Sequence, residues 1–292
     1  MEILDGKIAS QSVKEILKLA IQELITSNRR APHLAAILVG KNGASETYVA
    51  SKIKNCEETG FKSTLLRLDE NISENELIES ITKMNTDADI DGILIQLPLP
   101  KHIDENKILN TVDPSKDVDG FSPVSIGKMV LGLPTFIPAT PYGIMLMLEH
   151  YKIDTKGKHA VVLGRSNIVG RPISILLNQN NAFGDCTVTV CHSRTKNMKD
   201  ICLQADIIIA AIGKPGFLTA DMVKENAVVV DVGITRIADD TKKSGFAIRG
   251  DVDFINVAPK CSFISPVPGG VGLMTIAALL KNTFNAYQLR NK

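Results

Sequence analysis

The stretch His159–Gly170, which reads His-Ala-Val-Val-Leu-Gly-Arg-Ser-Asn-Ile-Val-Gly, decides the fold that we expect. Residues 159–163 form a short apolar run typical of a buried strand, and Gly164 ends it. Gly170 opens an apolar stretch that predicts a helix. Glycines at such a turn let the backbone approach a pyrophosphate, and the helix N-terminus adds N–H groups and a positive dipole. The spacing is not G-x-G-x-x-G, so a tight turn without a ligand is the alternative.

Similar alternation of strands and helices extends along the chain in both directions. In the second half, strand-like runs are separated by stretches able to form helices, which predicts a doubly wound parallel sheet with right-handed crossovers. The first half alternates too, and Glu76 follows Ser73 at the spacing of a capping box that begins a helix. The expected strands are 34–39, 63–68, 90–97, 159–163, 187–191, 206–212 and 227–232, and the expected helices include 45–58 and 143–150.

The chain is long for one domain and suits two. A Pro- and Gly-rich region from Asp113 to Pro141 separates the halves. We therefore expect two α/β domains that flank a cleft, the second being a Rossmann-type doubly wound sheet. The first domain should cover residues 1–139 and the second residues 140–273. The tail 274–292 contains an amphipathic helix that should pack back on the first domain.

Composition excludes several classes of protein. The 292 residues carry 33 basic and 32 acidic side chains, so nothing favours binding to nucleic acid or to an anionic membrane. We find no apolar run of membrane-spanning length and no signal-peptide pattern at the N-terminus. The 5 cysteines include no C-x-x-C pair, which argues against disulfides and a zinc site. We expect buried free thiols, no metal and a cytoplasmic location.

The end of the next strand indicates the choice of dinucleotide. Residues 187–191 are followed by His192, Ser193 and Arg194, where an NAD enzyme usually has a carboxylate for the ribose hydroxyls. A hydroxyl and a guanidinium, together with Arg165, suit a ribose 2′-phosphate instead. The pattern favours NADP. His192 is either a ligand or a locally hydrogen-bonded histidine at the end of a strand.

Four polar residues of the first half have the properties of a catalytic site. Tyr48 and Lys52 are four positions apart and share one face of the predicted helix. Partial burial beside polar groups would lower the pKa of the lysine and make it a proton shuttle, although a solvated helix face has the same spacing. Gln96 ends an apolar strand, and Asp119 lies in the turn 116–121. Each is satisfied locally or points at a ligand such as a heterocycle with N–H donors.

Together these motifs resemble the bifunctional methylenetetrahydrofolate dehydrogenase/methenyltetrahydrofolate cyclohydrolase family over essentially the full length of the chain. The resemblance implies a folate-binding catalytic domain and an NADP-binding Rossmann domain on either side of a pterin cleft, usually in a homodimer. It implies NADP-dependent oxidation of 5,10-methylenetetrahydrofolate, then hydrolysis to 10-formyltetrahydrofolate. The matching segments, in family order, are Tyr48-Val49-Ala50-Ser51-Lys52, Gly92 to Pro100, Lys116 to Phe121, Gly164 to Gly170, and Pro266 to Gly272.

The same resemblance assigns roles at the substrate. It makes Lys52 the catalytic acid/base, Tyr48 its neighbour at the substrate, Gln96 its hydrogen-bond partner and Asp119 the pterin anchor. The glycine-dense loop before the last helix can press its backbone onto a flat ligand. The expected substrate-binding residues are Tyr48, Leu97, Asp119, Pro268, Gly269 and Gly272.

For the cofactor, Arg165 and Ser193 match the family positions that bind the NADP 2′-phosphate. The expected cofactor-binding residues are Gly164, Arg165, Ser166, Val169, Gly170, Ser193, Arg194, Gly213, Gly233 and Ile234.

Two positions depart from the family pattern. The family commonly has P-C-T-P where this chain has Ala139 after Pro138, and a proline where this chain has Leu273. Neither position transfers a proton in the expected mechanism, so we expect altered substrate fit and retained activity. The alternatives are a monofunctional NAD(P)-dependent methylenetetrahydrofolate dehydrogenase and a non-catalytic regulator that binds folate or a dinucleotide.

Overall fold

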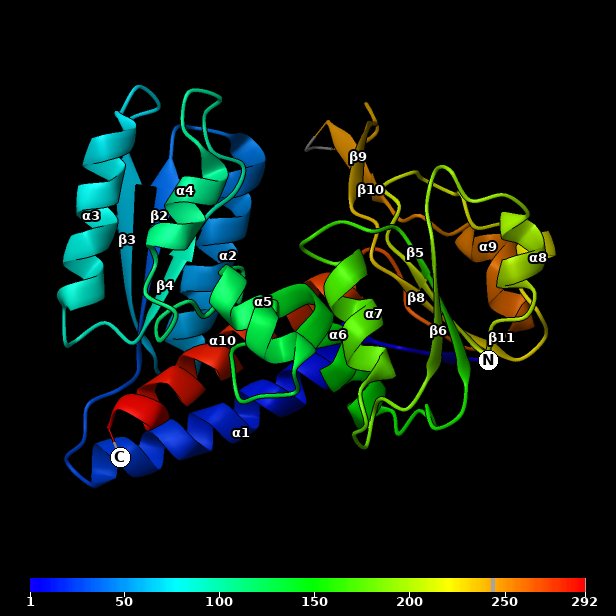
Figure 1. The fold of residues 1–292 in the computed structure, drawn as a ribbon, viewed down its shortest axis with the longest axis horizontal. Coiled ribbons are helices and arrows are strands. Elements are labelled where there is room, and N and C mark those ends of the chain that lie inside the picture. Colours follow the sequence, from blue (N-terminus) through cyan, green and yellow to red (C-terminus); the bar gives the residue numbers. More distant parts are fainter. Residues whose placement is uncertain (243–244, 292) are drawn as a thin grey trace. The chain divides into compact units, whose positions relative to one another are not determined.

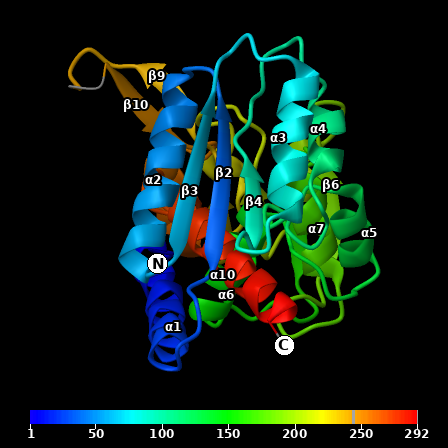
Figure 2. The same ribbon diagram turned by 90° about the vertical axis from the view of Figure 1, so that its left-hand side faces the viewer.

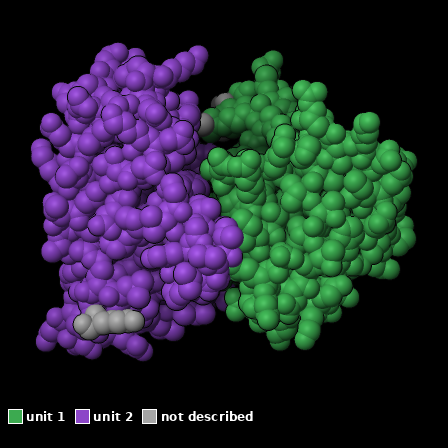
Figure 3. Space-filling model, viewed as in Figure 1, with its two compact units in different colours: residues 1–11, 140–275 green, residues 12–139, 276–292 purple. Residues whose placement is uncertain are grey.

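The computed structural model describes residues 1–242 and 245–291, and the chain divides into two compact units (Figure 3). Unit 1 contains residues 1–11 and 140–275, and unit 2 contains residues 12–139 and 276–292. Residues 1–11 therefore do not group with the rest of the predicted first domain. The reason is that strand β1 (Glu2–Ile3) pairs in parallel with strand β11 (Cys261–Ile264) of unit 1.

Unit 1 is built on a parallel sheet of strand order β1-β11-β8-β7-β5-β6 (Figure 1). The chain leaves β5 for β6 at one edge and then returns to β7 on the other side of β5. This reversal defines a doubly wound sheet, so the predicted α/β class is confirmed. The three strands of this reversal are β5 (His159–Leu163), β6 (Thr187–Cys191) and β7 (Ile207–Ala210), and β8 (Ala227–Asp231) follows next to β7.

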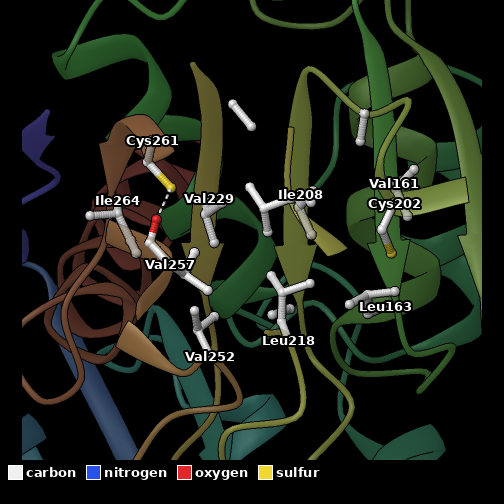
Figure 4. Packing of buried hydrophobic residues seen from close by; sticks show 14 of the residues in the cluster. Val161, Leu163, Cys202, Ile208, Leu218, Val229, Val252, Val257, Cys261 and Ile264 are labelled. Atoms are coloured by element: carbon white, nitrogen blue, oxygen red, sulfur yellow. Dashed lines mark hydrogen bonds between the residues drawn. The ribbon is translucent and has the colours of Figure 1, made fainter. Parts of the chain in front are cut away.

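Helices and apolar side chains cover this sheet, as its apolar central strands β5, β7 and β8 require. Helix α7 (Gly170–Asn178) packs against β5 and β6. On one face, Val161, Ile208 and Val229 form a buried cluster with Leu218 and Cys261 (Figure 4). The other elements of unit 1 are α6 (Ala139–His150), α8 (Met198–Cys202), η1 (Ala220–Met222), α9 (Phe254–Val257), η2 (Ala258–Lys260) and the antiparallel pair β9 (Thr235–Ala238) and β10 (Phe246–Arg249).

Unit 2 has three layers around the parallel sheet β3-β2-β4 (Figure 2). Side chains of a strand alternate between the two faces of its sheet. Leu34 and Ala36 accordingly join a core with helices α1 and α10, whereas Ala35 and Ile37 join a core with α3 and α4. The elements are β2 (His33–Val39), β3 (Lys62–Leu68), β4 (Gly92–Ile95), α1 (Gly6–Thr26), α2 (Gly43–Thr59), α3 (Glu74–Thr86), α4 (Glu105–Thr111), α5 (Pro123–Val130) and α10 (Val271–Arg290).

Local signals explain where two of these helices begin. The Ser73 side chain accepts a hydrogen bond from the Glu76 amide, and the Glu76 carboxylate accepts one from the Ser73 amide. The predicted capping box of α3 is therefore confirmed. Helix α5 begins after Ser122 with Pro123 in its first turn, where a missing N–H costs nothing. The Pro-rich region thus includes a helix that we did not predict.

All five cysteines are free and buried, as predicted. Burial raises the pKa of the Cys56 thiol to about 12, so this group is a thiol and not a nucleophilic thiolate at neutral pH. Among residues 1–242 and 245–291, His, Cys, Asp and Glu side chains form no group of three or more able to hold a metal ion. In that same part of the chain, no helix combines the length and apolarity needed to cross a membrane.

Candidate active site

The centre of the site in unit 2 is a buried lysine. Lys52 on α2 is only 9% exposed, and its Nζ donates a hydrogen bond to Gln96 Oε1 at 3.1 Å. Gln96 follows β4, and its Nε2 donates to the Leu97 carbonyl at 2.8 Å. This second bond turns the amide oxygen toward the lysine. The structure thus brings together Lys52 and Gln96, which we predicted to be partners.

A carboxylate completes the electrostatics of this site. Burial raises the pKa of Asp119 to about 6, although the positive charge of Lys52 opposes the shift. Burial likewise lowers the pKa of Lys52, and Asp119 opposes that shift. Each group is thus pushed toward its neutral form by desolvation and held back by the other. A proton can therefore be gained or lost here closer to neutral pH than at an exposed lysine or aspartate.

Asp119 lies in a loop whose shape is set by the neighbouring Asp117. The Asp117 carboxylate is buried, and its Oδ2 accepts hydrogen bonds from the Ser122 amide at 2.8 Å and from Ser125 Oγ at 2.9 Å. Its Oδ1 accepts from the Gly120 amide at 3.1 Å. Asp117 thereby ties the loop to the start of α5. The resemblance pointed to Asp119 in this turn, and the structure adds that Asp117 is the carboxylate that holds the loop.

Two further buried side chains tie this loop to neighbouring elements. Lys116 Nζ donates to the Asp87 carbonyl at 2.6 Å at the end of α3. Asn282 on α10 donates from Nδ2 to the Val118 and Ile137 carbonyls, both at 2.8 Å. Asn282 was missed by sequence reasoning. The available signal was a polar residue among the apolar positions of an otherwise buried helix face.

The remaining predicted substrate residues fall into two groups. Tyr48 lies one helical turn before Lys52 on α2 and is 36% exposed, and Leu97 is half-buried beside Gln96. Pro268, Gly269 and Gly272 belong to unit 1, where the Gly269 carbonyl accepts the Gly6 amide at 2.8 Å. Contact of these three residues with the substrate stays a prediction.

In unit 1, the turn after β5 is so tightly packed at two of its positions that only glycine fits there. Gly164 has φ +116°, and a Cβ on it would lie 2.1 Å from the Ala211 carbonyl oxygen. A Cβ on Gly170 would lie 2.3 Å from the Gly164 carbonyl oxygen. Both positions therefore require glycine. The resulting surface at the carboxyl end of β5 fits the close backbone approach that a pyrophosphate needs.

The first turn of α7 corrects one expectation. Ser166 Oγ accepts the amides of Val169 and Gly170 at 3.2 and 3.3 Å, and the Ser166 carbonyl accepts the Arg171 amide at 3.0 Å. Pro172 has no N–H. The predicted free N–H groups are therefore already bonded within the chain. The helix dipole and the nearby guanidinium groups can still attract an anion at this turn.

Those guanidinium groups gather at one edge of the sheet. Arg165 follows β5, whereas Ser193 and Arg194 follow β6, and all three are exposed. The two strands are hydrogen-bonded neighbours, and the Gly164 amide donates to the Cys191 carbonyl at 2.8 Å. Such a combination fits a ribose 2′-phosphate. His192 Nδ1 accepts the Arg194 amide at 3.2 Å, so this ring has a local structural partner.

The last predicted cofactor residues follow β7 and β8 at the same edge. Gly213 has φ +72° and open space where a Cβ would be, and its amide donates to Asp251 Oδ2 at 2.8 Å. The Gly233 amide donates to Asp231 Oδ1 at 2.9 Å, and the next residue, Ile234, is exposed. Neither Asp231 nor Asp251 was predicted as a site residue. Asp251 accepts amides that are 38 and 39 positions away in the sequence, and the bond of Asp231 to the Gly233 amide is typical of an ordinary turn.

The close packing at Gly170 leads to a testable prediction. Gly170→Ala should destabilise unit 1 by about 1–3 kcal/mol, because the new methyl group overlaps backbone that cannot move freely. It should also weaken dinucleotide binding. Thermal unfolding and NADP titration would measure both effects. Gly127→Ala on α5 is the matched control, since nothing lies within 4 Å of its Cβ position, and we expect it to be neutral or stabilising. Equal behaviour of the two variants would contradict the prediction.

Fold and site together define a class: an α/β enzyme with a doubly wound dinucleotide unit and a second unit that carries a buried lysine–amide–carboxylate site. The family model described as tetrahydrofolate dehydrogenase/cyclohydrolase, catalytic domain, matches residues 4–119. The companion model, described as its NAD(P)-binding domain, matches residues 138–291. The chain belongs to the tetrahydrofolate dehydrogenase/cyclohydrolase family, as the sequence motifs predicted.

Similar proteins cover nearly the whole chain. The bifunctional protein FolD of Cytophaga hutchinsonii is 60% identical over 290 residues, which are 99% of this chain and 100% of that protein. The crystal structure of the bifunctional FolD methylenetetrahydrofolate dehydrogenase/cyclohydrolase of Campylobacter jejuni is 50% identical, with a TM-score of 0.93 over 99% of each chain. The Trypanosoma brucei dehydrogenase-cyclohydrolase, complexed with NADP cofactor and inhibitor, is 34% identical, with a TM-score of 0.93 over 99% of this chain and 97% of that chain.

Proposed function

We propose that this protein oxidises 5,10-methylenetetrahydrofolate to the 5,10-methenyl compound with NADP and hydrolyses that product to 10-formyltetrahydrofolate. The enzyme is a bifunctional dehydrogenase and cyclohydrolase of one-carbon metabolism. The observation that carries the proposed chemistry is the 3.1 Å hydrogen bond between buried Lys52 and Gln96, with Asp119 close enough to shift the pKa of the lysine. We assign the folate to residues 12–139 with α10, and the dinucleotide to residues 140–273.

In the first step, a hydride leaves the methylene carbon and no proton need leave with it. When bound, NADP supplies the hydride acceptor. The chain's own contribution is orientation, because correct placement of two reactants removes much of the barrier to their reaction. The glycine turn 164–170 would hold the pyrophosphate region, and Arg165, Ser193 and Arg194 the 2′-phosphate. Gly213, Gly233 and Ile234 would contact the rest of the dinucleotide.

The second step needs a proton to move. Water attacks the methenyl carbon and gives up both of its protons, of which one must reach the ring nitrogen that departs and the other is released to solvent. Lys52 is our candidate for this acid/base role, since its burial disfavours a permanent positive charge. Gln96 would orient the amine, and Asp119 would accept hydrogen bonds from pterin N–H groups. Tyr48, Leu97, Pro268, Gly269 and Gly272 are the further residues that we propose for substrate binding.

The choice of NADP predicts the effect of removing one guanidinium. Arg165→Gln should raise the KM for NADP about tenfold, because a charge-assisted hydrogen bond to the 2′-phosphate is lost. Activity with NAD should change little, since NAD has no such phosphate. Initial rates with both dinucleotides would measure the ratio. Arg171→Gln is the matched control, because that exposed side chain donates to Asn167 Oδ1 at 2.7 Å. An unchanged NADP/NAD ratio in Arg165→Gln would argue against this 2′-phosphate site.

We further propose a homodimer, which the family resemblance implies and which light scattering of the purified protein would test, and a cytoplasmic location. The five free thiols support a reducing compartment.

Of the two departures from the family pattern, Ala139 is buried at the start of α6 and Leu273 is 39% exposed in α10. Neither side chain carries a group that can transfer a proton, so we expect altered substrate fit and retained activity.

The decisive assay mixes the purified protein with methylenetetrahydrofolate and either NADP or NAD, and follows reduced dinucleotide and methenyl product separately. We expect reduced NADP to form while the methenyl product fails to accumulate and the formyl product appears. Methenyl product accumulating as fast as it forms would indicate the alternative, a monofunctional dehydrogenase. Absence of any turnover would indicate a non-catalytic binding protein.

A further inference from the structure

We propose that Asp251 is a positioning residue for the dinucleotide site, because its buried carboxylate holds the loop after β7 at the point where the sheet reverses direction. This inference rests on the proposed NADP-dependent activity. It concerns the segment 211–214 and not a group that touches the substrate.

Sheet topology shows why this loop matters. Strands β5 and β7 are hydrogen-bonded neighbours, and the chain visits β6 on the far side of β5 between them. In such sheets the ligand binds outside the carboxyl ends of the strands where the order reverses, which here are the ends of β5 and β7. The turn after β5 lies directly against the loop after β7, since a Cβ on Gly164 would be 2.1 Å from the Ala211 carbonyl oxygen. A shift of the loop would therefore disturb the glycine turn.

Asp251 holds this loop by its backbone. Its Oδ2 accepts the Ile212 amide at 2.7 Å and the Gly213 amide at 2.8 Å, and the residue is 0% exposed. Because Gly213 has a positive φ and open space at its Cβ position, the fixed backbone leaves room for a ligand. The loop is thus held in place by a group on the protein side, which is what a preorganised binding surface requires.

The carboxylate has no positively charged partner among the described residues, where no salt bridge to Asp251 or Asp231 is found. Over the same residues, Asp251 Oδ1 is buried without a hydrogen-bond partner. A buried carboxylate in this state opposes stability. A neutral asparagine has the same shape and a smaller desolvation penalty, so packing alone does not explain a charged side chain. Hydrogen bonds from the two loop amides explain the charged side chain, because charge-assisted hydrogen bonds are stronger than those between neutral groups.

Asp231 fixes the backbone of Asp251 relative to the end of strand β8. Asp231 ends β8 and is buried, and its Oδ1 accepts the Asp251 amide at 2.9 Å. Its Oδ2 accepts the Val252 amide at 3.0 Å. The backbone of residue 251 is therefore tied to β8, while its side chain is tied to the loop after β7. Two buried carboxylates in series thus set the spacing of adjacent strand ends at the ligand-binding edge.

The test compares Asp251→Asn and Asp251→Ala with the full-length wild-type protein. NADP affinity would be measured by calorimetric titration in the absence of folate, and the hydrolysis of methenyltetrahydrofolate would be followed without any dinucleotide. Circular dichroism checks folding. Asp253→Asn is the matched control, because it makes the same change of charge two positions away, where the carboxylate accepts Asn256 Nδ2 at 2.7 Å.

We expect the Kd for NADP to rise about tenfold in Asp251→Ala and less in Asp251→Asn, which keeps an acceptor oxygen. Hydrolysis should stay within about twofold of wild type, since it needs no dinucleotide, and the control should match wild type. Wild-type NADP affinity in both folded variants would overturn the inference, as would a parallel loss of hydrolysis. If Asp251→Ala does not fold, Asp251→Asn decides alone. Failure of the wild-type protein to bind NADP would instead refute the proposed function, and the inference with it.

Discussion

Replacing Lys52 with methionine should lower the cyclohydrolase rate about a thousandfold while measurable dehydrogenase activity remains. Methionine fills a similar volume but cannot give or take the proton that the departing ring nitrogen needs. Hydride transfer involves no proton at this position, so it should suffer only from altered substrate fit. The two rates would be measured separately, by methenyl hydrolysis without dinucleotide and by formation of reduced NADP.

The matched control is Lys54→Met on the same helix, where the side chain is 73% exposed and lies 3.7 Å from Glu58. It should leave both activities unchanged. Equal loss of the two activities in a folded Lys52→Met variant would contradict the division of labour that we propose. Lys52 would then be a substrate-positioning residue common to both steps.

Asp119→Asn should instead lower kcat/KM of both activities about a hundredfold or more, because the pterin is bound in both. An asparagine presents an NH₂ group where the carboxylate would accept hydrogen bonds, and buried pterin donors would be left unpaired. The steady-state rates of both reactions would measure the loss. A variant that loses hydrolysis alone would show that Asp119 acts in proton transfer and not in binding.

The same variant should be more stable than wild type at pH 7.5. Burial raises the pKa of Asp119 from 3.8 to about 6, so the folded protein binds this proton more tightly than the unfolded chain does. Stability therefore falls as the pH rises from 3.8 to about 6, and the penalty persists above that range. Asparagine carries no such penalty. Thermal unfolding should show a higher Tm for Asp119→Asn at pH 7.5, with the difference disappearing below pH 4.

The control for this pair of effects is Asp113→Asn in the preceding turn. Asp113 is exposed, and its hydrogen bonds with Ser115 hold the pKa of its carboxyl below the usual value. Its replacement should remove a small stabilising contribution at pH 7.5 and leave both activities intact. A lower Tm for Asp119→Asn than for wild type would contradict the burial argument.

Much of the fold follows from local pattern. The strands predicted at 159–163 and 187–191 coincide with β5 and β6. The first is a short apolar run that reports burial directly, whereas the second is partly exposed and is indicated by its β-branched residues. The capping box at Ser73 is equally local. Helix α1 was not predicted, since exposed apolar residues such as Ile16 and Leu19 blur its amphipathic pattern. The site was found through motifs, and the Lys52–Gln96 contact agrees with the roles that those motifs imply.

The sequence by itself therefore determined the α/β class, most strand positions and the identity of the candidate catalytic residues. The tertiary structure alone decided which unit receives β1, that Ser166 already bonds the first amides of α7, and that Asp251 holds the loop after β7. The physical reason is distance along the chain. Strand and cap signals arise between residues a few positions apart, whereas Asp251 reaches amides 38 and 39 positions away. Only the packed sheet brings such residues together and makes their burial, and hence their electrostatics, specific.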